Sequence, residues 1–375
     1  MKSFSEQNMI SIWSGGGENY KQRSSNFELY RIICMMVIVA HHFVVNSGFT
    51  SEVGPLTTNP TGTNSMFLWL FGMWGKTGIN CFLLITGYFM CKSQITIRKF
   101  LKLMLWIYLY RIVIYVVFLV FGYETISTIR IVKLLMPVWG FHSNFTSCFI
   151  GFWLTIPFWN ILIRSMTSKQ HLILIALLVG MYSILGSVPS FSITFNYITW
   201  FGVIYLIASY IRIYPSSCLE NKVLWRMITI ASITLSVLSV IALLYIGRGH
   251  YDFFVCDSNK LFALVVAVSS FICIKNIHIP YSKTINVIGG STFGVLLIHA
   301  NSDAMRTWLW QDVVNCVGHY NMPLLQLMVF SLGVVLSVFF FCILIDRIRI
   351  KLIEEPFFKW YDKKPRFSKL ESYLS

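Results

Sequence analysis

The chain has 375 residues, of which 56% are hydrophobic and only 12% are charged. A soluble domain carries roughly a quarter charged residues, so this composition excludes an ordinary soluble protein and favours a membrane protein. The net charge of +15 is also seen in nucleic-acid-binding proteins, but here the basic residues lie in short stretches between apolar runs and after the last one. That position argues against a nucleic-acid partner and fits contacts with membrane lipids.

Residues 1–25 precede the first apolar run and are expected to form a flexible cytoplasmic leader. They lack the apolar core of a signal peptide. The apolar runs then continue to about residue 346, so we expect one transmembrane domain over 26–346. Residues 347–375 alternate basic and aromatic side chains, and we expect this cytoplasmic tail to lie along the inner membrane surface.

About ten apolar runs approach the roughly 20 residues that a membrane-crossing helix needs. The sequence therefore predicts an all-α fold, a polytopic membrane helix bundle with about ten transmembrane helices. The predicted spans are 27–47, 76–92, 101–121, 147–164, 171–188, 195–213, 226–246, 261–276, 285–302 and 323–345. With the N-terminus inside, the cytoplasmic stretches hold 22 Lys and Arg residues and the outer stretches hold six. Since basic residues favour the cytoplasmic side, this bias predicts that both termini are cytoplasmic.

The first span carries two polar side chains that are unusual in a membrane helix, Arg31 and His42. They are 11 positions apart, so they lie on one helix face, about 16 Å apart along the axis, whereas His41 points about 100° away. A snorkelling arginine and a hydrogen-bonded histidine are the structural alternative, but ionisable residues inside membranes are costly and mostly functional. We expect His42 to act as a general base on a hydroxyl. We expect Arg31 to hold an anionic group of a cofactor that approaches from the cytosol.

The nine cysteines lack the spacing of a metal site or of a disulfide framework. Most lie inside apolar runs, where cysteine acts as a small hydrophobic residue. The sequence also contains neither a phosphate-binding loop nor a GxSxG motif. We therefore expect no metal and no permanently bound cofactor.

With these residues in view, the chain resembles acyltransferase family 3, the membrane O-acyltransferases that act on bacterial glycans. In that family the first crossing carries a basic residue, ten further residues and a histidine, a spacing that Arg31 and His42 match. Four further segments resemble family segments in the family's order, namely INCFLLITGYFM (79–90), GFWLTIPFWN (151–160), STFGVLLIHAN (291–301) and IEEPFFKW (353–360). The resemblance thus extends over nearly the whole chain.

The resemblance implies an integral membrane O-acyltransferase in a bacterial plasma membrane, with 26–346 as its acyltransferase domain. Such an enzyme moves an acyl group from acyl-CoA, usually acetyl-CoA, to a sugar hydroxyl of a cell-surface polysaccharide or lipid-linked glycan. The family's histidine at the place of His42 is its proposed catalytic base, and the basic residue at the place of Arg31 is implicated in activity and donor binding. The acceptor sugar, the acyl group and the oligomeric state stay open.

Further cofactor-binding residues are expected at the inner end of the third span. The family has an Arg-x-x-Arg pair just inside the second or third crossing, where this chain has Arg98, Lys99 and Lys102. We expect these cations to hold the CoA phosphates, the lysines more loosely than an arginine fork would. The alternative for Lys99 and Lys102 is that they serve only to anchor and orient the chain in the membrane, as positive residues on the cytoplasmic side do.

Two more residues are expected to support the site. His299 closes the late family segment and is expected to position donor or acceptor, with an ordinary buried helix contact as the alternative. Glu28 precedes Arg31 by three positions and is expected to orient it through an ion pair. Arg111, alone in the third span, is expected to face the bundle interior because lipid exposure would be costly.

A transporter or flippase for glycans or lipid-linked sugars is the alternative function. Such proteins usually show broken helices and several cations around a central cavity, whereas the intramembrane charges here are few and concentrated at Arg31 and His42. Binding of acetyl-CoA by the purified protein distinguishes the two functions.

Overall fold

The computed structural model describes residues 24–364, except 137, 138, 142, 143, 192, 194 and 248. Residues 1–23 of the expected leader and residues 365–375 of the expected tail lie outside this range. The described residues form helices and no strands. In chain order the helical segments, with η for short 3-10 or π segments, are α1 (Ser25–Val45), α2 (Pro55–Thr58), α3 (Thr63–Gly72), α4 (Gly75–Met90), α5 (Ile97–Val120), α6 (Thr128–Leu135), α7 (Phe145–Ser165), α8 (Ser168–Val179), η1 (Gly180–Ile184), η2 (Leu185–Ser187), α9 (Tyr197–Ile213), α10 (Ser217–Glu220), α11 (Lys222–Ile246), α12 (Leu261–Lys275), α13 (Lys283–Gly289), α14 (Thr292–His299), α15 (Asp303–Thr307), η3 (Trp308–Val313), η4 (Val317–His319), α16 (Leu324–Arg349), η5 (Ile350–Glu354) and α17 (Glu355–Asp362).

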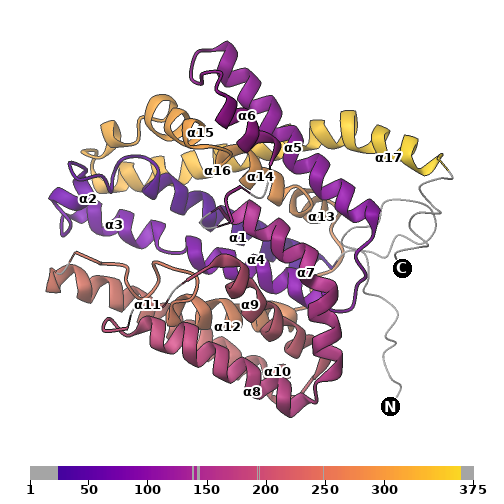
Figure 1. Cartoon of the computed structure of the whole chain (residues 1–375). Coiled ribbons are helices and arrows are strands. Elements are labelled where there is room, and N and C mark those ends of the chain that lie inside the picture. The colour runs from indigo at the N-terminus through magenta and orange to yellow at the C-terminus, as the bar shows by residue number, and fades with distance from the viewer. Residues whose placement is uncertain are drawn as a thin grey trace.

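Helix α1 lies at the centre of the bundle (Figure 1). It packs against α3, α4, α12, α13, α14 and α16. Its side chains Cys34, Val39 and Val44 are almost completely buried, although their spacing of five places them in different directions around the helix. A helix that is apolar on most of its circumference is stable only when other elements surround it, and this explains why the first span of the sequence becomes the core of the fold.

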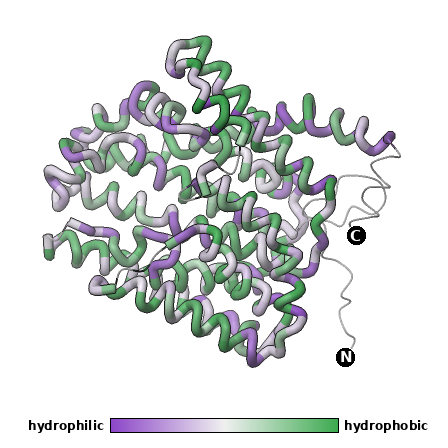
Figure 2. Tube along the Cα trace, in the orientation of Figure 1, coloured by the Kyte–Doolittle hydropathy of each residue, from purple (hydrophilic) through white to green (hydrophobic). Residues whose placement is uncertain are grey.

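The outer helices expose their apolar side chains instead of burying them. About 22% of the apolar stretch of α11 is buried, compared with 56% for α1, and hydrophobic residues run along the lengths of the helices (Figure 2). Large exposed side chains such as Ile230 and Tyr245 have no reason to face water but are expected on a surface that faces lipid. The protein is therefore a multi-pass membrane protein.

Seven helical stretches among the described residues are long and apolar enough to cross a membrane. Each of the ten predicted spans coincides with helical residues, but three of them give shorter elements. Helices α9 and α12 have 17 and 15 residues, and the ninth predicted span is divided into α13 and α14. The total of ten crossings stays a prediction.

Two glycines, one on each side of the break between α13 and α14, make close contacts. A Cβ atom at Gly289 would lie 2.5 Å from Glu28 Oε2, and one at Gly294 would lie 2.5 Å from Asp346 Cγ. Any larger residue at either position would push α13 away from α1 or α14 away from α16. These contacts fix α14 against the core, with His299 as its last residue.

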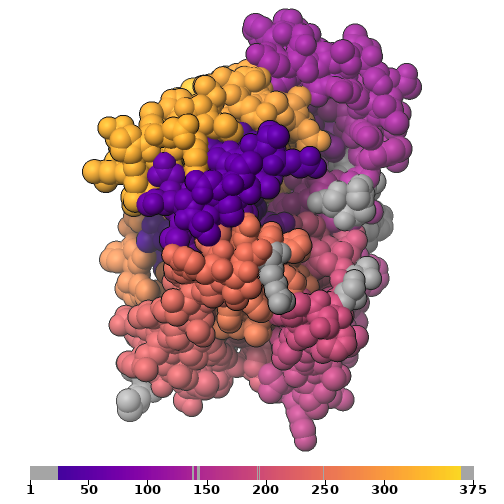
Figure 3. Space-filling view, turned by 90° about the vertical axis from the view of Figure 1, so that its left-hand side faces the viewer, coloured from indigo at the N-terminus to yellow at the C-terminus, as the bar shows by residue number. Residues whose placement is uncertain are grey.

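The first helix begins and the last long helix finishes at the same end of the bundle, which we call the basic end because Arg31, Lys102 and Arg349 gather there. Helix α16 continues beyond residue 345 through η5 into α17. The opposite, far end is seen in Figure 3, where the indigo stretch around α2 lies beside the yellow-orange C-terminal part. The side of the membrane that each end faces stays a prediction.

Candidate active site

His42 and His299 form a direct hydrogen bond, with 2.8 Å between His42 Nδ1 and His299 Nε2. His42 lies in the last turn of α1, and His299 is the last residue of α14. The ring of His299 is completely buried. The packing of α14 on α1 and α16 therefore joins two histidines that the sequence predicts in the first and ninth spans.

A backbone carbonyl determines which nitrogens of this pair carry protons. His299 Nδ1 lies 2.6 Å from the carbonyl oxygen of Val295, and since a carbonyl only accepts, Nδ1 must carry the proton. In a neutral ring, His299 Nε2 is then an acceptor, so His42 Nδ1 donates to it. The remaining nitrogen, His42 Nε2, is unprotonated and has no hydrogen-bond partner among the described residues. This arrangement gives His42 the free lone pair that a general base needs.

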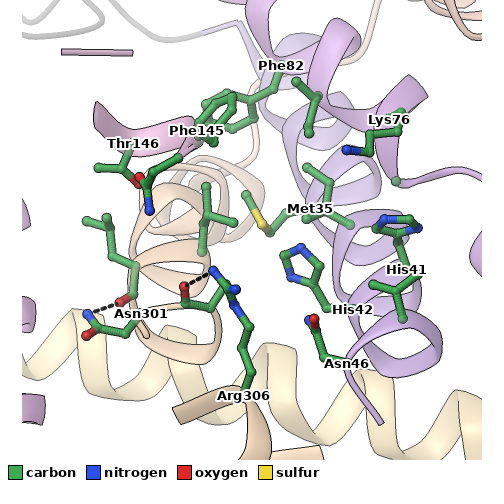
Figure 4. A pocket seen from close by; sticks show the side chains of 18 of the residues that line it. Met35, His41, His42, Asn46, Lys76, Phe82, Phe145, Thr146, Asn301 and Arg306 are labelled. Carbon is green, nitrogen blue, oxygen red and sulfur yellow. Dashed lines mark hydrogen bonds between the residues drawn. The ribbon is translucent and has the colours of Figure 1, made fainter. Parts of the chain in front are cut away.

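His42 lines a cavity of about 280 Å³. Three cations, Lys76, Arg111 and Arg306, also line it, and no carboxylate does so among the described residues. Figure 4 shows the His42 ring between the side chains of Lys76 and Arg306. The cationic lining of the cavity therefore favours a ligand that carries negative charge.

The three cavity cations differ in their partners. Lys76 Nζ donates to the hydroxyl of Tyr197 at 3.0 Å and forms an ion pair with Asp257 at 3.8 Å. Arg306 forms an ion pair at 2.8 Å with Asp303, whose side chain is 97% exposed. Arg111 forms no ion pair or hydrogen bond with any described residue, although it lies within a membrane-spanning helix. The expectation that Arg111 faces the bundle interior is met, because it lines the cavity.

His41 also lines the cavity but is held differently from His42. Its Nδ1 atom lies 2.7 Å from the carbonyl oxygen of Gly72. A Cβ atom at Gly75 would lie only 2.2 Å from His41 Cγ, so the ring packs tightly against the start of α4. His41 is thus engaged by the backbone of α3, whereas His42 is engaged by His299.

Arg31 lies in a second, smaller pocket at the basic end. This pocket has a volume of about 50 Å³ and is also lined by Lys102, Arg349 and Glu354. Arg31 is 8% exposed and forms the ion pair with Glu28 that their spacing predicts, at 3.3 Å. The sequence therefore identifies two cations of this pocket, Arg31 and Lys102, but not the third, Arg349.

Arg349 belongs to a buried network of charges. Its Nε atom donates to Asp346 Oδ1 at 2.8 Å and its Nη1 atom to Glu354 Oε2 at 2.6 Å. Lys102 Nζ lies 2.6 Å from Glu354 Oε1. The carboxylate of Asp346 is completely buried and also accepts hydrogen bonds from Trp106 and Tyr110. Such a network fixes the guanidinium of Arg349 in place, because leaving a buried charge unpaired costs several kcal/mol, about 3–5.

Arg98 and Lys99 do not line this pocket, although they share its end of the bundle. Arg98 pairs with Asp362. Lys99 Nζ donates to Ser93 Oγ and to the carbonyl oxygen of Gln94, both at 2.6 Å. Only Lys102 of the three predicted cations faces the pocket, since it lies one helical turn deeper than Arg98 and Lys99.

Phe82 lines both the cavity and the basic pocket. The Arg31 guanidinium lies 5.9 Å from the centre of its ring, and the ring stacks against Phe293 with 6.5 Å between centroids. The pocket of Arg31 and the cavity of His42 are thus neighbours along α1 and share the side chain of Phe82 in their walls.

A comparison with known families finds that the model of acyltransferase family 3, an acyltransferase domain, matches residues 25–347. The matched range contains Arg31, Lys102 and both histidines of the hydrogen-bonded pair. No curated protein and no solved structure matches the chain.

Proposed function

We propose a function from the premise that this chain belongs to acyltransferase family 3, whose model covers most of its length, and is therefore a membrane acyltransferase. The proposed reaction is O-acylation, in which an acyl group, most simply acetyl, moves from acyl-CoA to a sugar hydroxyl of a cell-surface polysaccharide or lipid-linked glycan. The proposed setting is the bacterial plasma membrane, with about ten crossings and both termini cytoplasmic. The basic end then faces the cytosol, where acyl-CoA is available.

The observation that carries this proposal is the hydrogen bond between His42 and His299. In the proposed reaction, His42 Nε2 takes the proton of the acceptor hydroxyl while that oxygen attacks the thioester carbonyl carbon. The tetrahedral intermediate collapses, the C–S bond breaks, and the leaving sulfur receives the proton from His42. His299 Nε2 accepts the Nδ1 proton of His42 throughout, so it can hold the imidazolium as well as the neutral ring.

The donor is proposed to bind from the basic end. Arg31, Lys102 and Arg349 offer the charge-assisted hydrogen bonds that phosphate groups require, and Arg349 contributes its Nη2 amino group, which has no hydrogen-bond partner among the described residues. The thin thioester arm of the donor would then pass Phe82 to reach His42. Arg98 and Lys99 stay predicted contacts for the parts of the donor that remain outside the pocket.

A transporter of glycans or lipid-linked sugars is the second candidate. The break between α13 and α14 favours it, because broken helices often surround transport sites. Here, however, the break lines the basic pocket through Gly289 and Gly290, and irregular backbone is tolerated in a membrane wherever it lines a cavity. The break therefore fits a donor site equally well.

The test uses purified protein in lipid nanodiscs, radiolabelled acetyl-CoA and glycan extracted from the producing cells. The proposal predicts saturable binding of acetyl-CoA and transfer of the label to the glycan as an ester that mild base releases. Binding without transfer in the His42→Ala variant would assign the chemistry to His42. A wild-type protein that neither binds acetyl-CoA nor labels glycan would overturn the proposal in favour of transport.

A further inference from the structure

An apolar groove of about 720 Å³ lies on the surface of the bundle, between α5 and α16. Both helices pack on α14, and residues of α14, α15 and η3 also line the groove. Along α16 it extends from Phe330 to Ile345, about 22 Å at 1.5 Å per residue. Side chains that line it, such as Val117 and Phe341, are 44% and 66% exposed. The groove is therefore open to the lipid phase and long enough for an extended hydrocarbon chain.

The floor of the groove includes His299, the histidine that is bonded to His42. Two elements also contribute residues to both the groove and the His42 cavity. On α5, Arg111 lines the cavity, and Ile114, one turn further along, lines the groove. On α15, Arg306 lines the cavity and its neighbour Met305 lines the groove. An amphiphilic molecule that reached past these elements would place its tail in the groove and its polar head in the cavity.

The charge of the cavity indicates the kind of head group. Its lining contains three cations and no carboxylate among the described residues. Lys76 and Arg306 pair with carboxylates outside the lining, whereas Arg111 forms no ion pair or hydrogen bond within the described part of the chain. Hydrocarbon chains gain little by leaving the surrounding lipid, which is equally apolar, so the selectivity must come from the head group. An anionic head group beside a hydroxyl matches this lining better than a neutral or zwitterionic one.

We propose that the acceptor is a lipid-linked sugar with a phosphate at its linkage, and that its hydrocarbon tail lies in the groove between α5 and α16. The phosphate then pairs with Arg111 and Arg306, and the sugar extends toward His42. This inference rests on the proposed function and specifies its substrate class. Binding of the tail in the groove then holds the sugar in one position, so that the same hydroxyl lies next to His42 in each turnover.

Gly333 offers a direct way to block the groove. It lies on α16 within the groove, and a Cβ atom added there meets no atom within 4 Å. A Gly333→Leu side chain would therefore fill groove space without disturbing packed neighbours. Gly180, at the junction of α8 and η1, is a matched control, since it is also free of neighbours within 4 Å and does not line the groove.

The experiment compares two acceptors, the lipid-linked glycan fraction of the producing cells and the same glycan after mild acid has released it from its lipid. Wild-type protein should prefer the lipid-linked form. In Gly333→Leu this preference, as a ratio of kcat/KM values, should fall about tenfold, equivalent to about 1.4 kcal/mol of binding. Gly180→Leu should keep the wild-type preference.

Each other outcome has a definite meaning. If wild-type protein acylates neither acceptor, the proposed function itself fails. If it acylates both forms equally, or if Gly333→Leu keeps the preference, or if Gly180→Leu loses it too, the acyltransferase stands but the groove does not hold the acceptor's tail.

A binding experiment tests the groove without activity. A prenyl monophosphate with a diazirine in its tail should label residues of α5 and α16 in wild-type protein and much less in Gly333→Leu. Excess phosphatidylglycerol vesicles serve as the competitor. Labelling that survives this competition supports the proposal, whereas labelling that phosphatidylglycerol abolishes would show that the groove holds ordinary membrane lipid and would overturn it.

Discussion

His42 Nδ1 and His299 Nε2 lie 2.8 Å apart although their residues are separated by 257 positions in the chain. The last turn of α1 supplies one ring and the end of α14 supplies the other. The buried ring of His299, held by the carbonyl of Val295, sets the tautomer of the half-buried ring of His42. The candidate base is therefore a pair of residues, of which one faces the cavity and the other positions it.

His299→Ala should lower kcat by about a hundredfold, within the range that proton transfer by a positioned side chain contributes, because His42 loses the acceptor that orients its Nδ1–H. The KM for acyl-CoA should change little, since His299 lies away from the basic pocket. His299→Gln should recover part of the rate, because its amide oxygen can accept the same hydrogen bond. Steady-state kinetics on purified wild type and both variants measures kcat and KM. Equal losses of kcat in the two variants would argue against the tautomer mechanism.

Lys102→Ala should raise the Kd for acyl-CoA about tenfold or more, because a hydrogen bond to a charged group contributes about 1.5–3 kcal/mol. Glu354 keeps its ion pair with Arg349 in this variant, so the protein should still fold. Lys99→Ala is the control, with a smaller expected effect, because Lys99 does not line the pocket. Isothermal titration with acetyl-CoA measures both affinities, and a larger loss for Lys99→Ala would favour the sequence-based assignment.

Phe82→Trp should lower acyl transfer at least tenfold by obstructing the junction between the basic pocket and the cavity, since a 1 Å misplacement of reacting groups can cost about a hundredfold. Phe340→Trp is a suitable control, because Phe340 is exposed on α16 and lines neither space. Transfer assays at equal protein levels compare the two variants. An unchanged rate in Phe82→Trp would show that the donor reaches His42 by another route.

Gly294→Ala should lower the melting temperature of the protein. The added Cβ atom would lie 2.5 Å from Asp346 Cγ, and overpacking of this kind costs about 1–3 kcal/mol. Gly333→Ala, whose Cβ meets nothing within 4 Å, should instead gain up to about 1 kcal/mol of helix stability. Thermal unfolding in detergent measures both shifts, and equal melting temperatures would contradict the close approach of α14 to α16.

Helix positions and the Arg31–His42 stripe could be predicted from the sequence because both depend on local periodicity. Apolar runs mark helices wherever they cross lipid, and the helical repeat places residues 11 positions apart on one face. The pairing of Glu28 with Arg31 is local for the same reason. The contact between His42 and His299 is different, since it depends on how α14 packs on α1, and no local pattern contains that information.

The sequence did not predict the buried network around Asp346, because a charged residue directly after an apolar run usually marks the end of a membrane span. The last predicted span stops at 345, but α16 continues to Arg349, which brings both charges into the bundle. Asp346 and Arg349 are three positions apart, like Glu28 and Arg31, and this spacing was the sequence pattern that indicated an ion pair. The roles predicted for Arg98 and Lys99 rested on the family's spacing, which cannot show that their side chains turn toward Asp362 and Ser93.

The most direct test of the central claim is the acyl content of surface glycan from cells that express wild type, His42→Ala or His41→Ala at equal protein levels. Nuclear magnetic resonance of the purified glycan quantifies the ester groups. The account predicts that His42→Ala abolishes the O-acyl signal while His41→Ala, whose ring is bonded to the backbone of Gly72, retains most of it. Full O-acylation with His42→Ala would contradict the account, because the hydrogen-bonded pair would then not supply the base.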